Sequence, residues 1–205
     1  MAERDLVYSS PTPQAVLRPL KQPLYDTENV PSAGGVAQFI FFTRPLGQNL
    51  GNAPVAIKTL ADTNMTQASQ LGTPQEFDLY GFNVRLGNVV TLADFQAVMD
   101  QGSFVFNYGQ GRPWLRCPLA DIPSGVAPSG ALSIDGAAAQ VVHDLPVQGV
   151  PSVKEFYNFC VGKKPSRIRS NENFSVEINY PNGAPNPAVF VRMQVVLRGI
   201  LYTSL

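Results

Sequence analysis

The segment Phe174-Ser-Val-Glu-Ile-Asn-Tyr180 decides the fold class, because the orientation of every residue can be inferred from it. Its apolar residues Phe174, Val176, Ile178 and Tyr180 alternate strictly with a serine, a glutamate and an asparagine. This period of two is typical of a β-strand with one buried face and one solvated face. The segment therefore predicts a half-buried strand in an antiparallel sheet.

A longer strand follows the turn-forming residues 181–187. Gly199 interrupts its pattern, as expected of a bulge or bend in an over-long strand. The apolar face is predicted to carry Val189, Val191, Met193, Val195, Leu197 and Leu201, and the polar face Arg192, Gln194 and Arg198.

Working outward from this pair, short apolar or alternating segments predict six further strands, which brings the expected total to eight. Residues 36–43 are apolar on both faces, so a central position in a sheet is expected. The apolar phase of the strand at 76–86 slips by one residue at Gly81, as an inserted bulge would cause. The six segments are 36–43, 76–86, 103–108, 113–119, 155–161 and 166–169.

Residues 91–100 predict a short helix. Thr91 can cap its N-terminus, and Asp94 lies favourably near the positive end of the helix dipole. Apolar residues recur at helical spacing, namely Leu92, Phe95, Val98 and Met99. Together these elements predict an all-β antiparallel β-sandwich with eight strands, one short helix and long loops.

Two segments lack sustained periodicity. Residues 1–35 hold five prolines and predict an extended N-terminal arm that packs over the body of the domain or onto a neighbouring subunit, which leaves residues 36–205 as one domain. Residues 120–152 form a long connection rich in Gly, Pro and Ala, expected to be an exchange or outer-surface element. Deleting residues 1–30 is accordingly expected to leave folding intact and to block assembly.

The composition limits the classes of partner. The 205 residues contain 15 cationic and 15 anionic side chains, so global charge does not favour nucleic acid or an anionic membrane. Charged residues make up 15% of the chain, against roughly 25% in an average soluble domain, which favours surface buried between subunits. Neither a signal peptide nor a transmembrane segment is expected. Cys117 and Cys160 are expected to be free, buried thiols.

The sequence offers few residues for a catalytic or metal site. His143 is the one histidine, and a Ser–His–Asp triad could use it, but no Gly-x-Ser-x-Gly nucleophile elbow occurs. A solvated loop histidine is the preferred interpretation. Zinc and the metal centre of cupins both need several clustered ligands, and the chain has only three Cys and His residues in total. No catalytic residue, cofactor or metal is therefore expected.

Two sets of residues are candidate binding sites. The local basic cluster of Lys163, Lys164, Arg167 and Arg169 could contact a few phosphates of nucleic acid on an inner surface. Zero net charge favours the alternative, a solvated strand edge. Trp114 lies near other aromatic residues and could stack on a sugar, although aromatics in alternating strands more often belong to the core.

The later strands resemble those of a known protein family. The run Ile168-Arg-Ser-Asn-Glu-Asn-Phe-Ser-Val-Glu-Ile178 and the run Val195-Val-Leu-Arg-Gly-Ile-Leu-Tyr202 resemble the closing strands of jelly-roll capsid proteins from icosahedral bacteriophages. Residues 103–119 resemble the middle strands of such proteins. The resemblance covers about the second half of the chain and implies an eight-stranded jelly roll. A double jelly roll would leave each strand too few residues.

The resemblance implies a structural virion protein, either capsid or capsid-associated, that acts by self-assembly. Its expected partners are further copies of itself, as a trimer or pentamer, and other virion proteins. The alternative is a receptor-binding or tail-spike β module that recognises cell-surface glycans, with Trp114 as the stacking residue. An enzyme that uses His143 is the third interpretation.

Overall fold

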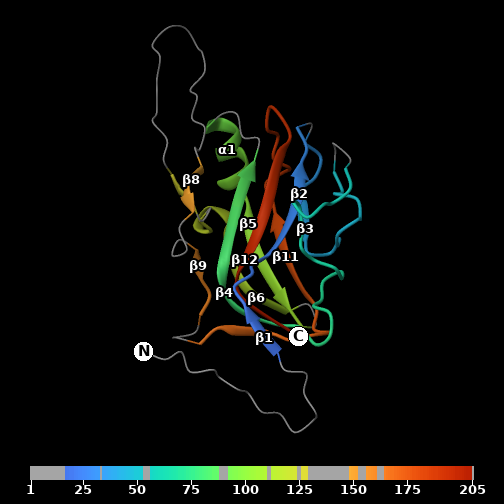
Figure 1. Cartoon of the computed structure of the whole chain (residues 1–205). Helices are drawn as coiled ribbons and strands as arrows, with labels where there is room; N and C mark the ends of the chain where they lie inside the picture. Colours follow the sequence, from blue (N-terminus) through green and yellow to red (C-terminus); the bar gives the residue numbers. More distant parts are fainter. Residues whose placement is uncertain are drawn as a thin grey trace, which may run out of the picture.

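The computed structural model describes residues 17–32, 34–52, 56–87, 92–109, 112–123, 126–128, 148–151, 156–160 and 164–204. In this part of the chain it has twelve strands, one α-helix and one 3-10 turn (Figure 1). The elements are β1 (Leu17–Leu20), β2 (Leu24–Val30), β3 (Gln38–Phe41), β4 (Glu76–Gly87), α1 (Leu92–Met99), β5 (Ser103–Tyr108), β6 (Arg112–Pro118), η1 (Leu119–Asp121), β7 (Val126–Pro128), β8 (Gln148–Pro151), β9 (Tyr157–Asn158), β10 (Ser166–Ile168), β11 (Phe174–Asn179) and β12 (Val191–Ser204).

Ten of these strands form two antiparallel sheets, so the prediction of an all-β sandwich is confirmed. The β12 sheet has the order β1-β12-β4-β10, with β2 also paired to β12 and β9 to β4. The β11 sheet has the order β3-β11-β5-β6, and β7 and β8 form a separate pair. Four of the pairings are nested along the chain: β2 with β12, β3 with β11, β4 with β10, and β5 with β6.

The alternation of β11 and β12 places the core between the sheets. In β11 the side chains of Phe174, Val176 and Ile178 are buried, and the residues between them are only partly covered. The inward row of β12 from Val191 to Leu201 is buried as predicted, but Val189 precedes the strand and is 38% exposed. The remaining core comes from both sheets, chiefly Phe39, Phe41, Phe77, Leu79, Phe82, Val84, Phe104, Phe106 and Ile168.

The bulge predicted at Gly81 lies where β4 meets β12. Arg198 pairs with Gly81 and Gly199 pairs with Leu79, so Tyr80 is the extra residue. A Cβ on Gly199 would lie 2.2 Å from the Asp78 carbonyl oxygen, and one on Gly81 would lie 2.1 Å from the Tyr157 carbonyl oxygen. Both glycines therefore belong to the same bulge. At each of them the backbone of another segment lies too close for a side chain to fit.

The predicted arm is wrong for its second half. Residues 17–30 form β1 and β2, which pair with β12 over Leu201–Ser204 and Val191–Leu197 respectively. The sandwich therefore includes residues 17–30, which the prediction had placed in the arm, and deleting residues 1–30 would remove two strands. Residues 1–16 lie outside the described residues.

Each of the eight expected segments contains a strand, but the count of eight falls short of the twelve observed in the described residues. The expectation missed β1, β2, β7 and β8. It also placed residues 36–43 centrally, whereas β3 lies at the edge of the β11 sheet. Its apolar outer residue Ile40 is 38% exposed there. Of the long connection at 120–152, the ends form β7 and β8, and residues 129–147 lie outside the described residues.

The predicted helix is confirmed as α1, which follows β4 at one end of the sandwich (Figure 1). The Tyr180 hydroxyl donates to the Val98 carbonyl oxygen at 2.9 Å, and the Ala188 amide donates to Asp94 Oδ1 at 2.7 Å. These contacts tie the helix to the segment between β11 and β12. Within the described residues, no helix has the length and apolar character needed to cross a membrane.

Candidate functional site

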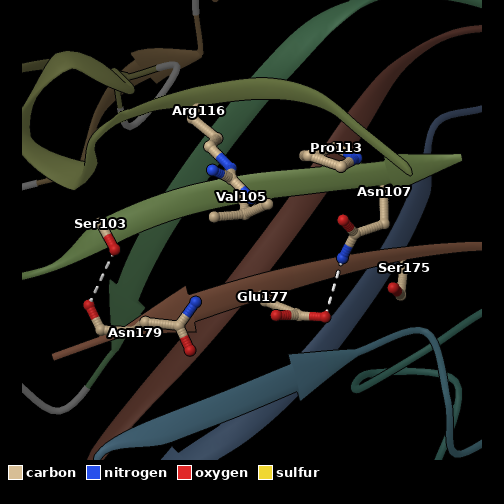
Figure 2. Close-up of a pocket in the computed structure, with 8 residues that line it drawn as sticks. All are labelled: Ser103, Val105, Asn107, Pro113, Arg116, Ser175, Glu177 and Asn179. Carbon is tan, nitrogen blue, oxygen red and sulfur yellow. Dashed lines mark hydrogen bonds between the residues drawn. The ribbon is translucent and has the colours of Figure 1, made fainter. Parts of the chain in front are cut away.

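The outward side of the β11 sheet holds a shallow polar depression of about 550 Å³ (Figure 2). We call this surface the outer β11 face. It arises from the alternation of the strands, because the inward residues of β5 and β11 fill the core. The side chains that line it are Ser103, Val105, Asn107, Pro113, Arg116, Ser175, Glu177 and Asn179.

A row of side chains crosses this face from strand to strand. The register pairs Ile40 with Glu177, Glu177 with Val105, and Val105 with Arg116. Asn107 Nδ2 donates to Glu177 Oε1 at 2.8 Å, which fixes the carboxylate (Figure 2). A second amide, from Gln38, donates to Glu177 Oε2 at 3.2 Å. The row thus presents a fixed anion, an exposed cation and two partly exposed apolar side chains, a mixture typical of protein-contact surfaces.

Arg167 of the predicted basic cluster is engaged within the fold. Its Nε and Nη2 donate to the two carboxylate oxygens of Asp78 at 2.7 and 3.0 Å, and its Nη1 contacts Glu76 Oε2 at 3.1 Å. The guanidinium also lies 5.1 Å from the centre of the Tyr202 ring. The hydrogen bonds to Asp78 raise the pKa of Arg167 above its usual value. This residue therefore joins β10 to β4 and β12.

The structure does not gather the other basic residues around Arg167 into one cationic site. Lys164 and Arg169 are exposed on either side of β10, and Lys163 lies outside the described residues. Since Asp78 and Glu76 offset the charge of Arg167, the local charge is not strongly positive. The geometry favours a strand held by carboxylates over a phosphate-binding patch.

Trp114 lies at a bulge in β6, at the side of the sandwich where β6 and β10 are the outer strands. Phe106 pairs with Leu115 and Asn107 pairs with Pro113, so Trp114 is the extra residue. Its indole is 48% exposed. It belongs to a chain of ring contacts that reaches the core, which we call the aromatic cluster: Phe82, Phe104, Phe106, Tyr108, Trp114 and Phe159.

The indole combines a structural contact with a free surface. Tyr108 meets it edge-on at 4.5 Å between ring centroids, and Phe159 stacks beneath it at 6.5 Å. Trp114 therefore covers the end of the aromatic cluster and leaves about half of its surface for another molecule. The ring contacts agree with the core interpretation for the covered part of the indole, and stacking on a sugar stays a prediction.

His143 lies outside the described residues. Cys117 and Cys160 are free thiols, but both are partly buried rather than buried. Burial raises the pKa of Cys117 to about 11, so this thiol stays protonated near neutral pH. Among the described residues, no three His, Cys, Asp or Glu side chains are grouped to hold a metal ion.

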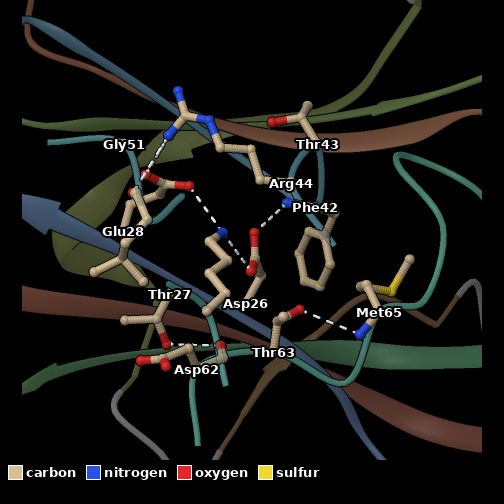
Figure 3. Close-up of polar contacts among 12 residues, drawn as sticks. Asp26, Thr27, Glu28, Phe42, Thr43, Arg44, Gly51, Asp62, Thr63 and Met65 are labelled. Atoms are coloured by element: carbon tan, nitrogen blue, oxygen red, sulfur yellow. Dashed lines mark hydrogen bonds and ion pairs between the residues drawn. The ribbon is translucent and has the colours of Figure 1, made fainter. Parts of the chain in front are cut away.

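A set of charged side chains that the sequence did not indicate lies at the opposite side of the sandwich. We call it the Lys58 cluster, and it comprises Asp26, Glu28, Arg44 and Lys58. Lys58 Nζ lies 2.7 Å from Asp26 Oδ1 and 2.9 Å from Glu28 Oε1, and all three side chains are at most 2% exposed. Arg44 Nη1 lies 2.9 Å from Glu28 Oε2, and Figure 3 draws this contact as a dashed line.

Lys58, Asp26 and Glu28 are buried because the connection from β3 to β4 wraps around β2. On the inward side, Asp26 and Glu28 share a face with Leu24 and Val30 of the core. On the outward side, the Thr27 hydroxyl donates to the Asp62 carbonyl oxygen at 2.9 Å, and the Asp62 carboxylate binds Arg192 of β12. Both faces of β2 are therefore covered by one connection.

Burial dominates the electrostatics of the two carboxyl groups. It raises the pKa of Asp26, although Lys58 acts in the opposite direction. It raises the pKa of Glu28 from 4.5 to about 7, again against the effect of Lys58. Gly51 makes room for the outer end of the cluster, because a Cβ there would lie 1.7 Å from Arg44 Nη1.

The backbone of Phe42 is aimed at Asp26 in an uncommon conformation. Its N–H donates to Asp26 Oδ2 at 2.6 Å (Figure 3). The φ angle of Phe42 is 68°, in the left-handed region that bulky residues rarely adopt. Strained backbone of this kind persists where the surrounding structure requires it, and it is frequent at functional sites.

Comparison of the chain with models of protein families, with curated proteins and with solved structures found no match.

Proposed function

We propose that this chain is a structural virion protein, capsid or capsid-associated, that acts by self-assembly. In this proposal its sandwich is a jelly roll, its location is the virion, and its partners are copies of itself and other virion proteins. The observation that carries the proposal is the nested pairing of the strands. The low content of charged residues and the mixed outer β11 face provide further support.

The nested pairing supports the jelly roll as follows. The eight strands involved pair first with last, second with seventh, third with sixth, and fourth with fifth. The contacts of β12 with β4 and of β11 with β5 then join these pairs into two facing sheets. An antiparallel ribbon rolled up in this way is the arrangement of a jelly roll, which serves as a shell-forming domain in viruses.

The outer β11 face is the surface that we assign to contact between copies. Glu177 and Arg116 lie in one row, two strands apart. Two copies related by a twofold axis could therefore place the Arg116 of each opposite the Glu177 of the other. The exposed apolar residue Ile40 would extend the contact at the edge of the row.

The proposal is tested by electron microscopy and sedimentation velocity of the purified protein at high concentration. Shells, trimers, pentamers or twofold-related assemblies are expected, and a monomer at every concentration contradicts the proposal. Arg116→Glu should weaken association through this face, and Arg116→Glu combined with Glu177→Arg should restore it. Arg169→Glu is the matched control, because Arg169 is exposed away from the row. Equal effects of all three variants would exclude this face.

Recognition of a surface glycan is the second candidate function, and the half-exposed indole of Trp114 is the observation that favours it. Aromatic rings stack on the apolar faces of sugars, and jelly rolls also serve as lectins. A glycan array compared between the wild-type protein and Trp114→Ala tests it. Loss of a bound glycan in the variant would favour a receptor-binding module over a shell protein.

A further inference from the structure

The Lys58 cluster places an amine and a carboxyl group in contact inside the sandwich. Lys58 Nζ and Asp26 Oδ1 are 2.7 Å apart, and both side chains are shielded from solvent. We propose that these two residues react with each other: Lys58 Nζ forms an amide bond with Asp26 Cγ, and one water molecule leaves. The product is an intramolecular isopeptide bond between β2 and the connection from β3 to β4.

Proximity supplies the first requirement of such a reaction. An amine held against a carboxyl group by the fold reacts as if the two were at a very high effective concentration. The two residues are 32 positions apart in the sequence, so only the folded chain brings them together. The surrounding core excludes water, which would otherwise compete with the amine and hydrolyse reactive species.

The second requirement is that both groups lose their charge. Water-free surroundings disfavour ions, so a proton can move along the hydrogen bond from Lys58 Nζ to Asp26 Oδ1 and leave a neutral amine beside a neutral acid. The rise in the pKa of Asp26 caused by burial acts in this direction. The neutral amine is the nucleophile, and the neutral acid is the better electrophile.

Glu28 supplies the proton transfers. Its Oε1 lies 2.9 Å from Lys58 Nζ, and its Oε2 is held by Arg44 at 2.9 Å. As Nζ attacks, this carboxylate can accept a proton from nitrogen and deliver it to the hydroxyl group that leaves Cγ. Arg44 orients Glu28 without contacting the reacting atoms.

The backbone of Phe42 supplies stabilisation of the intermediate. Attack on Cγ puts negative charge on Asp26 Oδ2, and the Phe42 N–H already donates to that oxygen at 2.6 Å. A fixed donor at the developing oxyanion is the arrangement that accelerates acyl transfer. This role gives a reason for the left-handed backbone at Phe42, whose φ is 68°.

The reaction balances without any further reagent. The Nζ–Cγ bond forms and the bond between Cγ and Oδ1 breaks. Two protons from nitrogen and one oxygen from the acid leave as water, and Glu28 returns to its initial protonation state. The amide has no net charge, so it also removes two buried ionic groups from the core.

The test is the intact mass of the purified, denatured full-length protein. The expected mass is lower than the calculated mass by one water molecule. Chymotryptic digestion should then yield the peptide containing Asp26 joined to the peptide containing Lys58, as tandem mass spectrometry can establish. An unchanged mass in the wild-type protein overturns the proposal and leaves the cluster as an ion-pair network.

Variants separate this bond from other losses of water. Lys58→Arg and Glu28→Gln should retain their calculated masses, whereas the exposed control Lys164→Arg should keep the loss. Asp26→Asn should react with release of ammonia and reach the same final mass as the cross-linked wild-type protein. A loss of water that persists in Lys58→Arg would indicate a cyclised aspartate elsewhere and would contradict the assignment. The wild-type measurement decides the matter even where a variant fails to fold.

Discussion

The two open sides of the sandwich are closed by opposite kinds of chemistry. Between β2 and β3, the gap is filled by the Lys58 cluster, in which Lys58 pairs with two carboxylates shielded from solvent. Between β6 and β10, it is filled by the aromatic cluster, which ends at the half-exposed Trp114. The aromatic side is stabilised by packing, so the stability lost on truncating one ring should increase with how deeply that ring is buried. The ionic side depends on complete pairing, so removing one partner should be far more damaging.

The largest effect is expected for Lys58→Met, which leaves Asp26 buried without its cation and leaves Glu28 with only its contact to Arg44. Breaking a buried ion pair costs about 3–5 kcal/mol of unfolding free energy. Urea denaturation monitored by fluorescence provides the measurement, and the exposed Lys164→Met is the control. Adding Asp26→Leu and Glu28→Leu to Lys58→Met should recover much of the loss, since well-packed apolar residues can replace a buried ion pair. No difference between Lys58→Met and Lys164→Met would contradict the comparison.

On the aromatic side, Phe159→Ala is expected to cost about 2 kcal/mol, less than the 3–5 typical of a fully buried phenylalanine. Phe159 contacts Phe82 and Phe106 with ring centroids 5.3 and 5.8 Å apart, but it is only partly buried. The same denaturation experiment measures the loss. Phe159→Leu should recover part of it, and a cost above that of Lys58→Met would reverse the ranking of the two sides.

The ionic side should also make stability depend on pH. The pKa of Glu28 is about 7 in the folded protein, above its ordinary value of 4.5. Between these values the folded state binds more protons than the unfolded state, so stability falls as pH rises, by about 1 kcal/mol per unit. Amide formation at Lys58 would leave the sign of this pH dependence unchanged. The positive charge of Lys58 lowers the pKa of Glu28, so losing that charge would raise this pKa further. The dependence should become smaller in Glu28→Gln and persist unchanged in the exposed control Asp100→Asn, as denaturation at pH 5 to 8 can measure.

The smallest effect is expected for Trp114→Ala, at about 1 kcal/mol or less. The indole is 48% exposed, and its loss uncovers Phe159 without opening a cavity in the core. Thermal unfolding followed by circular dichroism is suitable because it does not depend on the single tryptophan. A loss as large as that of Phe159→Ala would mean that Trp114 is a core residue.

The sequence was most informative where each strand buries one apolar face. β11 and the inward row of β12 follow their period of two, and the bulge at Gly81 appears as a slip in that period. Local patterns of this kind need no knowledge of a partner strand. The helix at α1 could be predicted for the same reason.

β2 could not be predicted in this way, because its inward face is only half apolar. The residues on that face are Leu24, Asp26, Glu28 and Val30. Acidic residues at two of the four inward positions make the segment look like a solvated arm in the sequence. Their burial is explained only by Lys58, which pairs with both of them in the folded chain. The prediction of a basic cluster did not foresee the contacts of Arg167 for a similar reason. Arg167 is close to Lys163, Lys164 and Arg169 in the sequence, but the carboxylates that bind it come from β4. Long-range charge pairing leaves no periodic signal in a single sequence.

The edge strand β6 has a consequence for how copies of this chain could join. It carries a bulge at Trp114, and Pro113 and Pro118 lack the N–H that a further strand would need as a donor. Growth of the β11 sheet by strand addition, the route to open-ended fibrils, is therefore disfavoured at this edge. In the assembly proposed above, copies would instead join through contacts between side chains, whose geometry can close a particle of fixed size.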